Sequence, residues 1–153
     1  MPYDIEVRRV EAHPVVSIRA TTTRDEVAST LAELLPEVAG YLAELGVEPT
    51  GPPFARWHDD WHDRTDLDAG LPVAVPVENS GRITAEELPG GEVVSTWHAG
   101  PYTSLTSAYS ALEAWMREHG RQSAGAPWEV YWTGPDDVTD PAEYRTEVLW
   151  PVR

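Results

Sequence analysis

The stretch GAPWEVYW, Gly125–Trp132, decides the fold because the chain contains a second version of it. That version is GPPFARWH, Gly51–His58, and both stretches read Gly-x-Pro-aromatic followed by residues typical of a β-strand. Each stretch follows a helical pattern that ends in glycine, at Gly46 and at Gly120. This recurrence predicts two copies of one structural unit.

The elements around the two stretches occur in the same order. A Val-Val-Ser strand precedes each helix, at Val15–Ser17 and Val93–Ser95, and a strand containing Pro-Val ends each unit, at Leu71–Val73 and Trp150–Val152. One shared tripeptide can arise by chance, but four elements in one order are better explained by a repeat. The chain therefore reads as β-α-β-β written twice.

The repeat predicts the fold class and the domain organisation. We expect one α+β domain over residues 1–153, with repeat 1 at about 3–78 and repeat 2 at about 83–153. The two βαββ repeats are expected to be related by a pseudo-twofold axis and to form antiparallel sheets with the helices covering one face. A ligand cleft is expected between the two halves.

The two helices are predicted from apolar residues at helical spacing. Thr23 and Glu26 form a Thr-x-x-Glu capping box at the start of the first helix, and Pro36 predicts a kink or a break inside it. The apolar positions of the first helix are Val27, Leu31, Leu34, Leu35, Val38, Leu42 and Leu45. The second helix is expected to open at Pro101. Its inner stripe consists of Leu105, Ala108, Tyr109, Leu112, Trp115 and Met116.

Composition and charge exclude several classes of protein. The 153 residues include seven Trp and six Tyr, which argues against disorder, and no Cys, which excludes disulfides and thiolate metal sites. No apolar run is long enough to span a membrane, the first residues show no signal-peptide pattern, and we expect a cytoplasmic protein. Eleven basic residues against 26 acidic ones give a net charge of −15, which repels nucleic-acid phosphates. We therefore expect neither a nucleic-acid nor a membrane partner.

Four runs of sequence resemble the GyrI-like (gyrase-inhibitor-like) family, whose domain also forms the effector-binding part of AraC- and MerR-type regulators. The runs are HAGPYTSLTSAYSALEAW (98–115), GAPWEVYWTGP (125–135), TEVLWPV (146–152) and DLDAGLPV (66–73). The resemblance implies a stand-alone domain with two βαββ units around a cleft that takes bulky, often cationic, aromatic drugs. In binding members a buried Glu in the strand after the second helix meets the positive charge of the ligand, and Glu129 occupies the matching position here.

The residues themselves leave two interpretations of Glu129. Strand alternation puts Glu129, Tyr131 and Thr133 on one face and Trp128, Val130 and Trp132 on the other. Glu129 can point to solvent, but both faces carry aromatics and the equivalent residue of the first repeat is Ala55, so we favour the cleft. A carboxylate removed from water then needs a partner or a raised pKa, and a delocalised cation between aromatic walls supplies the partner.

The aromatic candidates for the wall of the cleft are Tyr131, Trp57, Tyr102, Tyr109, Trp97 and Tyr144. Trp57 aligns with Tyr131 across the repeat, which would place the two on opposite sides of the axis. Tyr109 fits the helix core better than the wall, and Tyr102 can either cap the cleft or pack locally. Trp97 and Tyr144 rest on weaker arguments.

Two histidine-containing segments allow functional interpretations that we do not favour. WHDDWHD, Trp57–Asp63, contains His58 and His62 at a spacing that would suit a metal only on a helix, and it reads better as a solvated acidic loop. His98 precedes the second helix and can be a base or a structural residue. We expect no metal and no cofactor.

Three functions are compatible with these observations. The favoured one is binding or sequestration of lipophilic, cationic or aromatic small molecules, with Glu129 as the charge anchor. The second is hydrolysis of cyclopropane-bearing genotoxic compounds, known for stand-alone relatives, with Glu129 as the acid/base. The third is inhibition of DNA gyrase through protein contacts, as for a founding member of the family. The sequence leaves the oligomeric state and enzymatic turnover open.

Overall fold

The computed structural model describes residues 3–58 and 65–153. The elements in chain order are β1 (Glu6–Val10), β2 (His13–Thr22), α1 (Val27–Leu45), β3 (Phe54–Trp57), β4 (Thr65–Pro72), β5 (Ile83–Leu88), β6 (Gly91–Ala99), the 3₁₀ turn η1 (Tyr102–Ser104), α2 (Thr106–Glu118), β7 (Trp128–Thr133), the 3₁₀ turn η2 (Pro141–Glu143) and β8 (Arg145–Pro151). The predicted α+β class is confirmed. Each half contains the predicted order β-α-β-β, preceded by one strand that was not predicted, β1 in the first half and β5 in the second.

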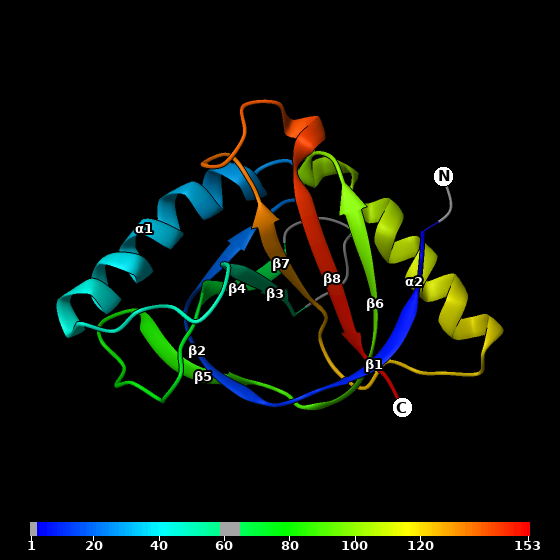
Figure 1. Ribbon diagram of the computed structural model, residues 1–153, viewed down its shortest axis with the longest axis horizontal. Coiled ribbons are helices and arrows are strands. Elements are labelled where there is room, and N and C mark those ends of the chain that lie inside the picture. Colours follow the sequence, from blue (N-terminus) through cyan, green and yellow to red (C-terminus); the bar gives the residue numbers. More distant parts are fainter. Residues whose placement is uncertain (1–2, 59–64) are drawn as a thin grey trace.

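The strands form one 8-stranded antiparallel sheet in the order β1-β6-β8-β7-β3-β4-β2-β5. The third strands of the two repeats, β3 and β7, meet in the middle of this order, and α1 and α2 lie toward opposite ends of the molecule (Figure 1). Ala55 and Glu129, which the repeat aligns with each other, are direct Cα partners in the β3–β7 pair. A pseudo-twofold axis therefore passes through the sheet beside Glu129.

Each half also exchanges a strand with the other, which the sequence did not reveal. β1 precedes β2 in the chain but pairs with β6, while β5 precedes β6 but pairs with β2. At the bend between β5 and β6 the backbone comes so close to its neighbour that a Cβ on Gly90 would lie 2.6 Å from the amide nitrogen of Ala12. The exchanged strands run along the bottom of Figure 1 and tie the two repeats together.

The helices differ from the prediction in four ways. α1 begins at Val27, and the Thr23–Glu26 pair closes a turn before it, with the amide of Glu26 donating to Oγ1 of Thr23 at 3.2 Å. The helix continues through Pro36 without a break, because packing on the sheet outweighs one lost hydrogen bond. The predicted inner position Leu45 is 48% exposed. α2 begins at Thr106, after η1, rather than at Pro101.

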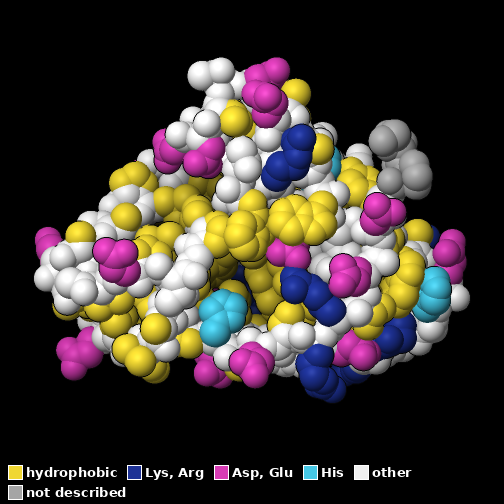
Figure 2. All heavy atoms as spheres, in the orientation of Figure 1, with side chains coloured by type: hydrophobic (Ala, Val, Ile, Leu, Met, Phe, Trp, Pro, Cys, Tyr) yellow, Lys and Arg dark blue, Asp and Glu magenta, His cyan; other side chains and the backbone are white. Residues whose placement is uncertain are grey.

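The two faces of the sheet carry separate hydrophobic clusters. The helices cover the larger one, which includes Val16, Leu31, Leu112 and Val148. The smaller cluster, with Phe54 and Trp128, lies on the opposite face, where hydrophobic side chains gather over the central strands around a hollow (Figure 2). Within the described residues, neither helix is long and apolar enough to cross a membrane.

Candidate functional site

The site is built around Glu129, which lies in the centre of the sheet and points to the helix-covered side. Its side chain is fully buried, and the strand partner on one side is the small residue Ala55. The partner on the other side is Val148, which belongs to the helix-face core. A buried carboxylate in such apolar surroundings costs several kcal/mol unless charged or polar groups meet it.

Residues from both repeats supply those groups. The hydroxyl of Tyr109 on α2 donates to Oε2 of Glu129 at 2.7 Å, and the hydroxyl of Tyr131 donates to Oε1 at 2.7 Å. Arg24, in the connection between β2 and α1, reaches the carboxylate with both terminal nitrogens, Nη2 to Oε2 at 2.9 Å and Nη1 to Oε1 at 3.4 Å. Each carboxylate oxygen therefore accepts two hydrogen bonds.

The guanidinium of Arg24 is also held by aromatic rings. It lies 4.5 Å from the ring centroid of Trp57 and 5.9 Å from that of Tyr109, which are cation–π distances. Its side chain is only 10% exposed. Arg24 thus makes the contacts that the sequence led us to expect from a bound aromatic cation: the carboxylate of Glu129 and the face of Trp57.

The protonation states of the cluster follow from burial and from Glu129. Burial raises the pKa of Tyr109 and Tyr131 well above its usual value, and the negative charge of Glu129 raises it further. Burial alone would lower the pKa of Arg24, but the charge and hydrogen bonds of Glu129 outweigh it and raise that pKa. Both tyrosines therefore stay protonated donors and Arg24 stays charged over the physiological pH range.

A cavity of about 480 Å³ lies between α1 and the loop that follows β7. This volume is in the range of small-molecule sites. Helix α1 contributes small and apolar side chains, and the loop 134–137 forms the opposite wall. The lining residues are Ala28, Leu31, Ala32, Leu35, Pro36, Ala39, Pro53, Leu71, Tyr102, Tyr131, Gly134, Pro135, Asp136 and Asp137.

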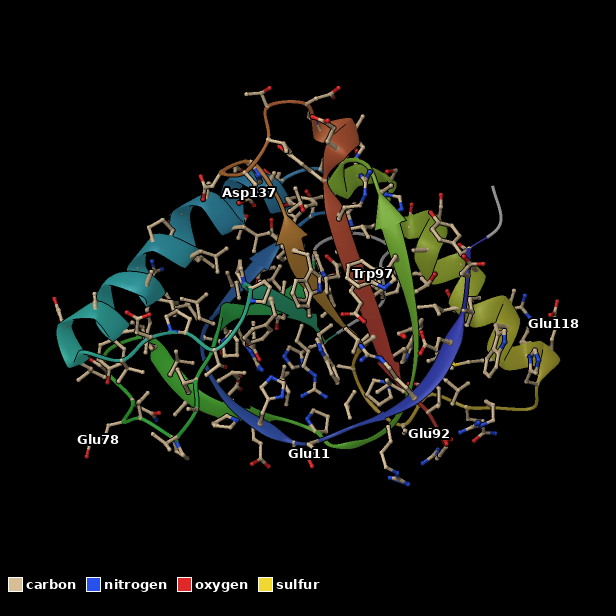
Figure 3. All side chains as sticks on the ribbon, viewed as in Figure 1. Glu11, Glu78, Glu92, Trp97, Glu118 and Asp137 are labelled. Carbon is tan, nitrogen blue, oxygen red and sulfur yellow. The ribbon has the colours of Figure 1, made fainter. Side chains whose placement is uncertain are left out.

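Tyr131 links this cavity to the charged cluster, because its ring lines the cavity and its hydroxyl bonds Glu129. Tyr102 stands beside it at a ring-centroid distance of 5.0 Å, and Tyr144 follows at 5.2 Å from Tyr102. Tyr102 approaches the loop so closely that a Cβ on Gly134 would lie 2.9 Å from its hydroxyl. Asp137 adds negative charge where this loop faces α1 (Figure 3). The site is therefore apolar and aromatic inside, with carboxylates behind it and at its edge.

The structure brings together six of the seven residues predicted from the sequence. Glu129, Tyr131, Tyr109 and Trp57 meet around Arg24, and Tyr102 and Tyr144 continue from Tyr131. Trp97 does not join them. It is 51% exposed on the face of the sheet away from the helices, where its ring lies 6.0 Å from that of Trp132 (Figure 3).

The remaining histidine candidates have local partners. His58 lies 2.7 Å from Oδ2 of Asp68, and His98 lies 2.9 Å from the hydroxyl of Tyr3 and 2.8 Å from Oγ of Ser104. The rest of the proposed acidic loop, including His62, is outside the described residues. Within 3–58 and 65–153, no group of three metal-ligating side chains lies close enough together to hold an ion.

Comparisons with known proteins agree with this architecture. The model of the family described as the GyrI-like small molecule binding domain matches residues 3–153, and the chain belongs to that family. No curated protein sequence matches the chain.

Solved structures with the same fold include domains of larger proteins. The crystal structure of the EcmrR C-terminal domain is 26% identical, with a TM-score of 0.89 over 100% of this chain and 99% of that one. In the EcmrR–DNA complex solved by cryo-EM, the match is again 26% identical over the whole of this chain, with a TM-score of 0.88, but covers 58% of the EcmrR chain. The chain thus spans little more than half the length of the EcmrR chain in that complex.

More distant structures share the fold alone. A hydrolase from Listeria innocua is 15% identical with a TM-score of 0.70, over 99% of this chain and 93% of that one. SAV2435, solved with tetraphenylphosphonium bound, is 13% identical with a TM-score of 0.67, over 100% and 94% of the two chains.

Arg24, the cation that meets Glu129, was not among the residues predicted for the site. Arg24 is 105 residues away from Glu129 in the chain, in a turn that reads as an ordinary polar helix start. The sequence signal at this position, the Thr23–Glu26 capping box, places Arg24 in the turn before the first helix but does not indicate a contact with Glu129.

Proposed function

We propose that this GyrI-like domain binds bulky lipophilic aromatic molecules in the cavity between α1 and the loop after β7, with Glu129 as the anchor for cationic ones. Multidrug binding or sequestration is the corresponding role. The observation that carries the proposal is the position of Tyr131, whose ring lines the cavity while its hydroxyl bonds the fully buried carboxylate of Glu129.

The cavity has the properties that such ligands require. Its volume of about 480 Å³ lies in the range of sites for drug-sized ligands, and burying apolar surface there gains roughly 25 cal/mol per Å² before the costs of association. Stacking on Tyr131 and Tyr102 tolerates different ligand shapes, which favours broad specificity over recognition of one compound.

Charge supports a preference for cations. Glu129 lies behind Tyr131, Asp136 and Asp137 line the cavity, and the whole chain carries a net charge of −15. A lipophilic cation is attracted by the two aspartates and by the negative net charge, and by Glu129 to the extent that Arg24 leaves its charge uncompensated, whereas an anion of the same shape is repelled. The lipophilic cation tetraphenylphosphonium, which SAV2435 binds on the same fold, is therefore a suitable first probe.

Hydrolysis of cyclopropane-bearing compounds is the less favoured alternative. A carboxylate has about four lone-pair sites, and Glu129 already accepts four hydrogen bonds from Arg24, Tyr109 and Tyr131. A general base needs a free site for the water that it activates. Glu129 would have to lose one of these partners before it could act as a base. Gyrase inhibition stays a prediction that a supercoiling assay can test.

The test is a fluorescence titration with tetraphenylphosphonium, other lipophilic cations and neutral aromatic compounds. Wild type should bind several of them saturably. Glu129→Gln should lower the affinity for the cations by about tenfold or more and the affinity for neutral compounds by less. Mass spectrometry of the bound ligands then separates binding from turnover. If no compound of a varied panel binds the wild type, the proposed function is wrong.

Glu147→Gln is the matched control for Glu129→Gln. Glu147 is also a buried glutamate of the central sheet and is also paired with an arginine, Arg8, but it belongs to β8 and points to the opposite face. Its substitution should leave cation binding within about threefold of wild type. An equal loss in both variants would show that the effect comes from general electrostatics rather than from the site.

A further inference from the structure

We infer that Arg24 is an internal cation occupying the charge site of Glu129, and that a cationic ligand gains the full attraction of Glu129 only by displacing it. This inference rests on the proposed function and names the residue that sets its charge selectivity. Arg24 touches the carboxylate of Glu129 at 2.9 Å and lies 4.5 Å over Trp57, so it fills the position where a ligand cation would be neutralised.

The electrostatic consequence concerns the cavity beside the pair. As long as Arg24 remains in place, the Arg24–Glu129 pair has no net charge, and a cation on the ring of Tyr131 meets little more than a dipole. A neutral molecule and a cation of the same shape should then differ little in affinity. Once Arg24 leaves, Glu129 acts on the cavity as an uncompensated negative charge in a poorly solvated place.

The structure allows the side chain of Arg24 to leave without unfolding the domain. Arg24 extends from the turn between β2 and α1, and this turn is held by the bond from the Glu26 amide to Thr23 Oγ1 at 3.2 Å and by the bond from the Thr30 amide to the Glu26 carbonyl at 3.0 Å. Neither bond uses the Arg24 side chain. Its neighbours Asp25 and Glu26 are exposed, so a rotated guanidinium would enter water beside two carboxylates.

The rest of the cluster cannot move in this way. Glu129 and Tyr131 are fixed in the central strand β7, and Tyr109 is fixed in α2, where each is at least nine-tenths buried. Exchange of cations is therefore easier than opening of the carboxylate site. The exchange keeps Glu129 paired, and the net gain comes from the apolar surface that a lipophilic ligand buries in the cavity.

This mechanism makes the site selective for ligands that are both cationic and lipophilic. A small hydrated cation brings no apolar surface to offset the displacement of Arg24, and a neutral aromatic compound has no charge with which to replace it. Free guanidinium at millimolar concentration should therefore fail to compete with a bound lipophilic cation. A lipophilic cation, which has both the charge and the apolar surface, should displace Arg24.

The first experiment compares methyltriphenylphosphonium with triphenylphosphine oxide, a neutral compound of similar shape, by calorimetric titration. Arg24→Gln should bind the cation about tenfold or more tightly than wild type, because the internal competitor is gone, and should bind the oxide within about threefold of wild type. The double variant R24Q/E129Q should not show this increase in affinity for the cation. Equal or weaker cation binding in Arg24→Gln than in wild type would overturn the inference.

The outcomes separate this inference from the proposed function. If neither compound binds wild type, Arg24→Gln or the double variant, the proposed function fails. If both compounds bind wild type but Arg24→Gln does not favour the cation, the function holds and Arg24 is a structural partner of Glu129.

A second experiment on the wild type decides the question even if Arg24→Gln folds poorly. The side-chain Nε–H of Arg24, which is buried in the unliganded domain, should exchange faster with water in NMR when methyltriphenylphosphonium binds and stay unchanged with triphenylphosphine oxide. The double variant, which lacks Arg24, identifies this signal. An Arg24 Nε–H whose exchange is unchanged or slowed in the presence of saturating cation would contradict displacement of Arg24.

Discussion

Two buried glutamates of the central sheet, Glu129 on β7 and Glu147 on β8, make the same kind of contact in different surroundings. Each accepts hydrogen bonds from an arginine and from an aromatic residue: Arg24 and Tyr109 for Glu129, Arg8 and the Trp132 indole for Glu147. The side chain of Arg8 is 39% exposed, whereas that of Arg24 is 10% exposed. The pair on the open face is partly solvated, and the pair on the helix face is sealed.

This difference separates a structural ion pair from a candidate binding site. Water can replace Arg8 beside Glu147, so that pair contributes little to stability or to the charge felt by a ligand. Only a protein group or a ligand can replace Arg24 at Glu129, and the adjoining cavity of about 480 Å³ gives a ligand a place from which to do so. An Arg–Glu pair can thus serve as part of a binding site where it is buried and lies beside an open cavity.

Removing each arginine should give the largest contrast between the two pairs. Arg24→Gln leaves a fully buried carboxylate without its cation and should lower the free energy of unfolding by about 3–5 kcal/mol. Arg8→Gln should cost about 1 kcal/mol or less, because water reaches that pair. Urea denaturation measures both, and equal costs would show that burial does not distinguish the pairs.

A double-mutant cycle sharpens the same comparison. Glu129→Gln should cost less than Arg24→Gln, about 1–3 kcal/mol, because the freed guanidinium can reach water from its turn whereas the carboxylate cannot. Adding Glu129→Gln to Arg24→Gln should restore part of the stability, giving a coupling energy of at least about 2 kcal/mol. The corresponding cycle for Arg8 and Glu147 should give a coupling energy of less than about 1 kcal/mol.

The tyrosine hydroxyls should have the next largest effect. Tyr109→Phe and Tyr131→Phe each remove a buried hydrogen bond to the charged Glu129 and should lower the free energy of unfolding by about 1.5–3 kcal/mol. Tyr41→Phe is the control, since its hydroxyl donates to the carbonyl of Glu78 at an exposed position and should cost about 1 kcal/mol or less. If Tyr109→Phe costs no more than Tyr41→Phe, Tyr109 does not help to hold the carboxylate.

Filling the cavity should change binding with the smallest effect on stability. Ala32 lines the cavity from α1. Ala32→Leu should lower the affinity for lipophilic ligands by about tenfold or more, and should change the free energy of unfolding by about 0.5 kcal/mol or less. Ala43→Leu makes the same change at an exposed position of α1 that is not part of the lining and should leave affinity unchanged. Unchanged affinity in Ala32→Leu would place the ligand elsewhere.

The sequence predicted those parts of the molecule that depend on local pattern and on the repeat. Helical spacing located α1 and α2, strand alternation placed Glu129 and Tyr131 on one face, and alignment of the repeats paired Ala55 with Glu129. These features follow from residue order alone, because equivalent strands of a twofold repeat meet at the axis.

The missed features depend on distant parts of the chain. The exchange of β1 and β5 between the halves leaves no local trace, since a strand has the same pattern whichever neighbour it pairs with. Trp97 was included only as one more aromatic residue, and the sequence does not tell which face of its strand the helices cover. Arg24 was missed because no spacing rule connects a turn at the start of α1 with a strand 105 residues later.

The displacement of Arg24 from Glu129 is tested most directly by a crystal structure of the domain with saturating methyltriphenylphosphonium. We predict the triaryl group between α1 and the loop 134–137, against the ring of Tyr131, with the side chain of Arg24 turned away from Glu129. A ligand in the hollow on the opposite face of the sheet or against Trp97, with the cavity beside Tyr131 empty and Arg24 still paired with Glu129, would contradict this prediction.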